Sequence, residues 1–350
     1  MLIVMKSDAT PEQIDAVCSR LRGHGYAPQT IAGSAQTVID AGQAAGDLSD
    51  DAVRRLAGVA DCVPANGPDR LVARREPLQA TVVDVRGERI GGGAFQIIAG
   101  PCAVESRDQL MRTAQWVARC GVKFLRGGAF KPRSSPYAFQ GLRDEGLKFL
   151  AEAGREFDLR IVTEVKDGET LEQVAAVADV LQIGSRNMQN FSLLEAVGRQ
   201  RKPVLLKRGM GSRLDELFMA AEYVMAQGNR DVILCERGIR TFETLTRNTF
   251  DLSAVVMARH HTHLPIVADP SHGVGIGWAV PALARASVVA GADAVMVEVH
   301  PNPAEALSDG QQALTLDAFE RLSAELNSLR RWVEDAGEAG SPSNPRSAKA

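Results

Sequence analysis

The sequence predicts an α/β protein: a (β/α)8 TIM barrel preceded by a β-hairpin and a small N-terminal ferredoxin-like α+β domain. From Phe95 onward, eight short apolar runs alternate with amphipathic helical runs over roughly 240 residues, which is the size and pattern of such a barrel. A doubly wound open sheet is the weaker alternative, because no Gly-x-Gly-x-x-Gly motif opens the first helix. The third observation is that the preceding segment carries four expected short strands and two helices, the content of a ferredoxin-like β-α-β-β-α-β sandwich.

Residues 1–76 are predicted to form this first unit. Strands are expected at Leu2–Met5, Thr37–Ile39, Asp61–Val63 and Leu71–Ala73, with helices at Pro11–His24 and Asp50–Leu56. About 75 residues suffice to fold but leave little room for a catalytic pocket. The unit is therefore interpreted either as a folding or oligomerisation cap or as a regulatory ligand-binding domain, and the residues alone favour neither.

Residues 77–334 are predicted to form the barrel domain, and residues 335–350, rich in Gly, Ser, Pro and Ala, a disordered tail. A hairpin at 81–90, turning at Arg86-Gly87-Glu88, precedes the first barrel strand and is placed to plug the barrel floor. The eight expected barrel strands are Gln96–Ala99, Val122–Leu125, Arg160–Thr163, Val180–Ile183, Pro203–Leu206, Val232–Leu234, Pro265–Ala268 and Ala294–Val297.

The composition is that of a soluble enzyme. A net charge of −3 suggests neither nucleic acid nor an anionic membrane as a partner. No run of eighteen apolar residues is present, so we expect no membrane span, and the first residues do not resemble a signal peptide. The five cysteines, an odd number at irregular spacing, favour a reducing, cytoplasmic location over a disulfide framework.

Cationic side chains follow several predicted strands. In parallel α/β folds the carboxyl ends of the strands share one rim, where ligands bind. The cations are Arg126, Arg186, Lys207 and Arg237 at strand ends, with Lys131 and Arg133 in the loop after the second strand. Each one alone is better explained by a solvated side chain or a structural ion pair. Six converging cations predict an anionic ligand, and their number suggests two phosphate groups.

A second set of residues at the same rim has metal-ligand chemistry. Cys102 follows the first strand, His272 the seventh and Glu298 the eighth, and Asp309 lies in the next loop. Singly, each has an ordinary structural explanation. Together, a thiolate, an imidazole and two carboxylates suit Mn, Fe, Co or Zn better than Mg or Ca.

Two acids, Glu164 and Asp269, also end strands, where they either neutralise cations or position water or a hydroxyl. His300 is expected to be a loop residue rather than a fifth ligand. The motif His260-His261-Thr-His263 is expected to be solvated rather than metal-binding.

Several long motifs make the chain resemble the 3-deoxy-D-arabino-heptulosonate 7-phosphate (DAHP) synthase family, in its type I beta subfamily. The resemblance covers about residues 80 to 330, and the first unit resembles the ferredoxin-like feedback domain that some members carry. The motifs are IIAGPCAVE, LRGGAFKPRSSPYAFQG, QIGSRNMQN, LLKRG, CERGIRTFE and DPSH.

This resemblance implies condensation of phosphoenolpyruvate with erythrose 4-phosphate, releasing phosphate, as the first step of the shikimate pathway of aromatic amino acid biosynthesis. It also implies one divalent metal ion, a tetramer and a possible aromatic amino acid effector. By resemblance, the metal ligands are Cys102, His272, Glu298 and Asp309. The phosphoenolpyruvate site comprises Arg126, Lys131, Ser185, Arg186, Lys207 and Arg237, and the sugar-phosphate loop comprises Pro132, Arg133 and Ser134. Glu164 and Asp269 place the attacking water and contact the aldose, and Lys131 is a proton donor.

Two alternatives remain open at this stage. The related 3-deoxy-D-manno-octulosonate 8-phosphate synthases use arabinose 5-phosphate on the same barrel, but their sugar-phosphate loop reads Lys-Ala-Asn-Arg-Ser. Here Lys131-Pro132-Arg133-Ser134 favours the four-carbon aldose. The other alternative is a non-catalytic barrel that only senses phosphoenolpyruvate or an amino acid, and the complete set of metal ligands and Lys131 disfavours it.

Overall fold

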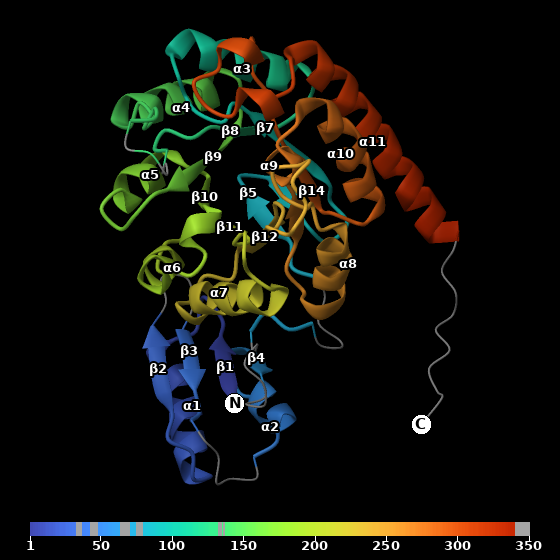
Figure 1. Cartoon of the computed structure of the whole chain (residues 1–350). Helices are drawn as coiled ribbons and strands as arrows, with labels where there is room; N and C mark the ends of the chain where they lie inside the picture. Colours follow the sequence, from blue (N-terminus) through green and yellow to red (C-terminus); the bar gives the residue numbers. More distant parts are fainter. Residues whose placement is uncertain are drawn as a thin grey trace.

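The computed structural model describes residues 1–32, 37–42, 48–63, 71–74, 80–131, 135 and 137–339. Over these ranges the chain forms a closed parallel barrel surrounded by helices, a two-stranded hairpin and a four-stranded sheet with two helices (Figure 1). The predicted fold class is confirmed.

The barrel strands pair in sequence order, and β14 pairs with β7 to close the ring through contacts such as Glu298 with Gly100. Each expected strand is present with its ends shifted by two residues at most. All neighbouring pairs are parallel, so every strand delivers its last residue to the same rim. The strands are β7 (Gln96–Gly100), β8 (Phe124–Arg126), β9 (Arg160–Val165), β10 (Val180–Ile183), β11 (Val204–Lys207), β12 (Val232–Glu236), β13 (Ile266–Ala268) and β14 (Ala294–Glu298).

The helices cover the outside of the barrel with their apolar faces. In α3, for example, Leu110, Ala114 and Val117 are buried, and Ser106 caps the first turn by accepting a hydrogen bond from the Gln109 N–H. The last helix continues to Ala339, so residues 335–339 are helical and the expected disordered tail does not begin at 335; residues 340–350 lie outside the described ranges. The helices are α3 (Arg107–Arg119), α4 (Asp144–Glu156), α5 (Leu171–Val177), α6 (Phe191–Gly198), α7 (Leu214–Ala226), α8 (Leu252–His261), α9 (Pro270–Val274), α10 (Val280–Val289) and α11 (Leu316–Ala339).

The hairpin β5 (Val83–Val85) and β6 (Glu88–Ile90) closes one end of the barrel. Its turn residues Arg86 and Gly87 both have positive φ, 52° and 90°, as a tight two-residue hairpin turn requires. The apolar hairpin side chains form one buried cluster with inward-facing residues of the barrel strands, so the hairpin fills the floor as predicted. The members are Val83, Val85, Ile90, Ile98, Phe124, Val162, Val180, Leu205, Ile233, Cys235, Val267, Ala294 and Met296.

The N-terminal unit is an antiparallel sheet of order β2-β3-β1-β4. The strand β2 was not predicted. It is a four-residue edge strand that pairs with β3, and its sequence Gln-Thr-Ile-Ala does not alternate polar and apolar residues. Leu71–Ala73, which was predicted as a strand, does not join the sheet, and Ala73 forms only an isolated bridge with Thr262. The elements are β1 (Leu2–Met5), α1 (Pro11–Gly23), β2 (Gln29–Ala32), β3 (Thr37–Asp40), α2 (Asp50–Arg54) and β4 (Val59–Val63).

The two faces of this sheet are buried in different cores. Ile3 and Ile39 pack with residues of α1 and α2. Leu2, Val4 and Val38 belong to the apolar cluster that continues into the barrel helices, and in Figure 1 the sheet lies against the α6 and α7 side of the barrel. The first domain is therefore packed on the barrel rather than tethered beside it.

The segment that joins the two domains is bonded to the barrel through its backbone. The Glu222 carboxylate of α7 accepts hydrogen bonds from the Leu71 N–H at 2.5 Å and the Val72 N–H at 2.9 Å. On the other side, His263 contacts the Leu71 carbonyl at 2.7 Å. These bonds occupy the backbone groups that a sheet would need, which explains why the apolar run Leu71–Ala73 is not a strand.

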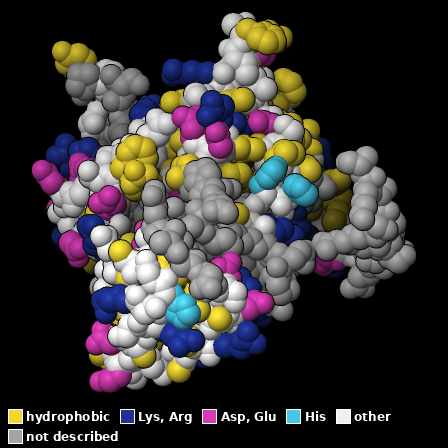
Figure 2. Space-filling view, turned by 90° about the horizontal axis from the view of Figure 1, so that it is seen from below, with side chains coloured by type: hydrophobic (Ala, Val, Ile, Leu, Met, Phe, Trp, Pro, Cys, Tyr) yellow, Lys and Arg dark blue, Asp and Glu magenta, His cyan; other side chains and the backbone are white. Residues whose placement is uncertain are grey.

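The surface is mixed in charge. On the face seen in Figure 2, basic and acidic side chains are interspersed rather than gathered by sign. None of the helices in the described part of the chain has the length and apolar character needed to span a membrane.

Candidate active site

The carboxyl-terminal rim of the barrel carries nearly all of the predicted site residues. Arg126, Lys207 and Glu298 are the last residues of β8, β11 and β14. Glu164 lies inside β9, one residue before its end. The remaining residues occupy the loops that follow strands, so the parallel topology alone accounts for their convergence.

A pocket that opens to solvent lies at this rim. Its lining contains six cations and the acids Glu164 and Asp309. Five of the six were predicted, together with Ser185, which also lines the pocket. Pro132, Arg133 and Ser134 lie outside the described residues, so the sugar-phosphate loop stays a prediction. The six cations are Arg126, Lys131, Arg186, Lys207, Arg237 and Arg247.

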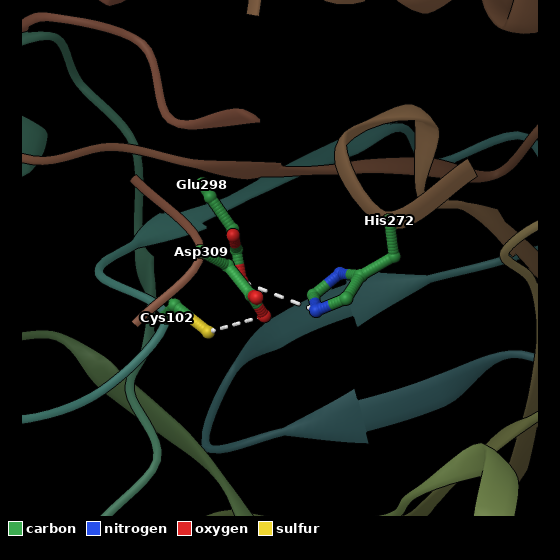
Figure 3. Close-up of side chains that lie close together, drawn as sticks. All are labelled: Cys102, His272, Glu298 and Asp309. Atoms are coloured by element: carbon green, nitrogen blue, oxygen red, sulfur yellow. Dashed lines mark hydrogen bonds and ion pairs between the residues drawn. The ribbon is translucent and has the colours of Figure 1, made fainter. Parts of the chain in front are cut away.

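The four predicted metal ligands lie together beside this pocket (Figure 3). Their ligand atoms are all within 4.8 Å of one another. The Cys102 Sγ is 3.3 Å from the Asp309 carboxylate, and the His272 Nε2 is 3.2 Å from the Glu298 Oε1. Four donors from three barrel segments therefore face a common point.

The chemistry of these donors fits a divalent metal. Burial acts to raise the pKa of Asp309, but Arg247 and His272 lower it more, to about 2, so this carboxylate is ionised at neutral pH. For Glu298, burial is likewise outweighed by His272 and Arg126, and its pKa is lowered. Burial raises the pKa of the Cys102 thiol to about 11. A cation bound at the thiol would favour its loss of the proton and so give the thiolate ligand. Two ionised carboxylates, an imidazole nitrogen and a thiol are ligands for a first-row transition ion.

Asp269 fixes the orientation of His272. Its Oδ2 lies 2.8 Å from the His272 Nδ1 and accepts a hydrogen bond from the Lys207 ammonium at 2.5 Å. The Nδ1 thus faces Asp269, and the Nε2 is turned toward Glu298 and the ligand cluster, which is a common arrangement around metal-binding histidines. Burial acts against the charge of Asp269, yet His272 and Lys207 hold its pKa well below its usual value. Asp269 is fully buried and does not line the pocket.

Two residues of the site were missed by sequence reasoning. Arg247 lines the pocket and forms an ion pair with Asp309 at 3.5 Å. Gln312 is fully buried, donates to the Glu298 Oε2 at 2.8 Å and accepts from Arg247 at 2.8 Å. Arg247 lies in an irregular loop and Gln312 ends a short 3-10 helix (Gly310–Gln312); neither follows a strand end, so no local signal marked them.

Lys131 is buried against the ligand cluster. Its ammonium donates to the Cys102 carbonyl at 3.0 Å and lies 3.2 Å from the Cys102 Sγ. Burial acts to lower the pKa of Lys131, but Cys102, Glu164 and Glu298 raise it more, so the side chain keeps its proton. Gly128 makes this position possible, because a Cβ there would lie 2.6 Å from the Lys131 Cδ.

Glu164 is held by the neighbouring strand. The Gln182 amide donates to its Oε2 at 3.4 Å. Gly184, at the end of β10, has ordinary backbone angles (φ −67°), but a Cβ there would collide with the Glu164 carboxylate. The Gly in the Gln-Ile-Gly-Ser-Arg motif is therefore required by the position of the acid.

Replacing Gly184 by alanine is expected to displace Glu164 without harming the fold, because the backbone conformation accepts alanine and only the carboxylate clashes. A displacement of about 1 Å can cost up to about 100-fold in turnover, so we expect a reduction of that order in kcat at unchanged thermal stability. Gly168→Ala is the matched control, since a Cβ at Gly168 would meet nothing within 4 Å. Equal activity of both variants would show that the position of Glu164 is unimportant.

The histidines behave differently from one another. His260 and His261 are exposed, as expected, whereas His263 was expected to be solvated and is buried. It contacts the Thr81 hydroxyl at 2.6 Å as well as the linker carbonyl. His300 lies outside the ligand cluster, as predicted.

The fold and the site together define a barrel enzyme with an anion pocket next to a metal-ligand set. Residues 77–334 match the model of the DAHP synthetase I family, and residues 1–66 match the DAHP synthase ferredoxin-like domain. The chain therefore belongs to the DAHP synthetase I family, which confirms the resemblance seen in the motifs.

Individual relatives agree with this. The phospho-2-dehydro-3-deoxyheptonate aldolase of Thermotoga maritima is 45% identical over 335 residues, which cover 94% of this chain and 97% of the relative. The crystal structure of the Thermotoga maritima enzyme covers 95% of this chain and 97% of its own, with a TM-score of 0.75 at 44% identity. A 2-dehydro-3-deoxyphosphooctonate aldolase of Acidithiobacillus ferrooxidans is 34% identical over 260 residues, covering 69% of this chain and 91% of the relative.

Proposed function

We propose that this enzyme catalyses the metal-dependent condensation of phosphoenolpyruvate with erythrose 4-phosphate and water, giving 3-deoxy-D-arabino-heptulosonate 7-phosphate and phosphate. This reaction is the first step of the shikimate pathway. The observation that carries the proposal is the pocket itself, where six cations lie beside four clustered metal ligands. The name of the relative that is 45% identical supports it as well.

The cations divide into paired and available ones. Arg126 is paired with Glu298 at 2.9 Å and Lys207 with Asp269 at 2.5 Å. Arg186 is exposed, and its side chain has no hydrogen bond or ion pair to the described residues. Arg237 is buried, its side chain donates to the Gly238 carbonyl at 3.3 Å and to no other described residue, and burial lowers its pKa. These two guanidinium groups are the best placed to bind phosphate oxygens in bidentate fashion.

The chemical step follows from the positions of Lys131 and Glu164. A divalent ion held by Cys102, His272, Glu298 and Asp309 would supply Lewis-acid polarisation of the aldehyde when bound. Carbon 3 of phosphoenolpyruvate forms a bond to the aldehyde carbon, and the Lys131 ammonium gives its proton to the oxygen that gains charge. Water placed by Glu164 then adds to the cationic carbon 2 and gives one proton to the Glu164 carboxylate. The resulting hemiketal phosphate loses inorganic phosphate, which takes the hydroxyl proton as carbon 2 becomes a ketone, and the proton on Glu164 restores the Lys131 ammonium.

The proposal is tested by following phosphoenolpyruvate consumption by chelator-stripped protein to which Mn²⁺ is restored. Erythrose 4-phosphate and arabinose 5-phosphate are compared side by side. We expect turnover with erythrose 4-phosphate and Mn²⁺ only. Preference for arabinose 5-phosphate would assign the octulosonate reaction instead, and turnover with neither aldose would leave a barrel that only senses its ligand.

We also propose a regulatory role for the N-terminal domain, with an aromatic amino acid as the effector, and a cytoplasmic location. The support is the match of residues 1–66 to the ferredoxin-like domain of the family. Adding Tyr or Phe to the same assay tests this role, since inhibition by either one identifies the effector.

We further propose that the chain forms a homo-oligomer, with a tetramer as the state that the family implies. Large apolar side chains are exposed on two segments at the rim, one after β12 and one after β13. A hydrogen bond of 2.9 Å from the Arg247 N–H to the Val274 carbonyl joins these two segments. Phe242 is 97% exposed, and Leu245 and Trp278 are each 84% exposed, which is costly for a monomer. Sedimentation equilibrium checks this; a monomer at micromolar concentration contradicts it.

A further inference from the structure

Glu105 connects the two loops that carry Cys102 and Asp309. It lies three residues after Cys102, just before α3, and its side chain is 9% exposed. Its Oε1 accepts a hydrogen bond from the Leu307 N–H at 2.9 Å, and its Oε2 lies 3.2 Å from the His300 Nε2. Leu307 and His300 both belong to the connection between β14 and α11. One carboxylate therefore holds the second loop at two points.

The hydrogen bonds of His300 show that this contact is directional. The His300 Nδ1 accepts a hydrogen bond from the Asn302 N–H at 3.1 Å. A ring nitrogen that accepts a hydrogen bond carries no proton, so the proton is on Nε2, which donates to the Glu105 carboxylate. A charged acceptor makes this bond stronger than one between neutral groups.

The Asp309 loop needs such support because its backbone is strained. Asp309 has φ 53°, in the left-handed region that non-glycine residues rarely adopt. A conformation of this kind is unfavourable for a non-glycine residue and persists only when surrounding contacts fix it. Glu105 accepts a hydrogen bond from the N–H of Leu307, which lies two residues before Asp309. Its carboxylate thus links the Asp309 loop to the loop that carries Cys102.

The Cys102 side of the connection is braced as well. Gln109 in α3 accepts a hydrogen bond from the Glu105 N–H at 3.3 Å and donates to the Ala103 carbonyl at 3.2 Å. The position of Glu105 is thereby set by the first turns of α3. Through Glu105, the distance between the Cys102 and Asp309 loops depends on a helix outside the pocket.

We propose that Glu105 is a positioning residue of the metal centre: it fixes the strained Asp309 loop relative to Cys102 and thereby sets the affinity for the ion. The inference rests on the metal site of the proposed function. Glu105 itself does not line the substrate pocket. Its loss should therefore weaken metal binding and leave phosphoenolpyruvate binding at saturating metal unchanged.

The test compares wild type, Glu105→Gln and a matched control, Glu305→Gln. Glu305 faces the same surface hollow as Glu105 and is exposed, without a side-chain partner among the described residues. Mn²⁺ affinity is measured by equilibrium dialysis. Replacement of groups that orient metal ligands typically costs 10–100-fold in affinity, so we expect the Kd of Glu105→Gln to rise by about that factor. Glu305→Gln should match wild type.

Two further readouts separate positioning from general damage. With Co²⁺, the thiolate-to-metal absorption of Glu105→Gln should reach the wild-type intensity at saturation, but at a higher concentration of the ion. The KM for phosphoenolpyruvate at saturating metal should equal that of wild type. His300→Leu, which leaves the bond between Glu105 and Leu307 in place, should weaken Mn²⁺ binding by a smaller factor.

The outcomes are distinguishable. If wild type, Glu105→Gln and His300→Leu all bind Mn²⁺ with the same affinity, the positioning role of Glu105 is wrong, while the proposed metal centre stands. Wild-type protein that binds no transition ion overturns the proposed metal centre, and this inference with it. A raised KM for phosphoenolpyruvate in Glu105→Gln at saturating metal would show that Glu105 acts on the substrate pocket instead.

Discussion

Cys102→Ala is expected to remain folded and to lose metal-dependent turnover. Loss of Lewis-acid assistance removes several kcal/mol of transition-state stabilisation. At 1.36 kcal/mol per tenfold change in rate, this corresponds to a reduction of at least about 1,000-fold in kcat. The measurements are Mn²⁺ affinity by equilibrium dialysis and phosphoenolpyruvate consumption with erythrose 4-phosphate.

The fold should tolerate this change because the thiol lies in a polar cluster rather than in an apolar core. Its contacts are the Ser308 hydroxyl at 3.2 Å, the Asp309 carboxylate at 3.3 Å and the Lys131 ammonium at 3.2 Å. Cys120→Ala at the end of α3 is the matched control, since Cys120 is a partly exposed cysteine away from the ligands. Full activity of Cys102→Ala with metal concentrations strictly controlled would remove Cys102 from the assigned site.

Lys131→Met is expected to lower kcat by a factor of about 100 to 10,000, the range for loss of a positioned proton donor. Methionine keeps the length and apolar stem of lysine but carries no proton and no charge. The contact of the Lys131 ammonium with Cys102 places it next to the proposed metal site, where the aldehyde oxygen would gain charge in the proposed reaction. Pre-steady-state and steady-state consumption of phosphoenolpyruvate measure the effect.

A second variant separates proton donation from charge. Lys131→Arg keeps a cation but holds its proton too strongly to donate it, so it should stay within tenfold of Lys131→Met if donation is what matters. Lys148→Met, on the exposed face of α4, is the control and should match wild type. Near-normal kcat in Lys131→Arg would assign Lys131 a purely electrostatic role.

The fold could be predicted almost entirely from the sequence. Strands such as Val204–Lys207 begin as continuous apolar runs (Val-Leu-Leu) and lead into Gly-bearing loops, and this pattern comes directly from burial on both faces of a parallel strand. The site residues at strand ends were predictable for the same reason, because topology brings Arg126, Lys207 and Glu298 to one rim.

Elements that depend on tertiary contacts were not predictable. The edge strand β2 depends on its pairing with β3 and on Ile31, which packs against the large apolar cluster, and Leu71 is held out of the sheet by Glu222, a residue 151 positions later in the chain. Arg247 reaches the site from an irregular loop and Gln312 from a short 3-10 helix, and His263 is buried by the linker that covers it. Each of these positions is defined by a partner distant in sequence, which no local pattern reveals.

The hairpin at the barrel floor has a consequence for the order of events in catalysis. Apolar side chains from the hairpin and the inner strands fill the barrel below the pocket, so within the described part of the chain the rim is the way in and the way out. If the proposed condensation joins two substrates in this pocket, the substrate that binds deeper has to enter first. The second molecule then blocks the exit of the first, and initial-rate kinetics should show ordered addition rather than random encounter.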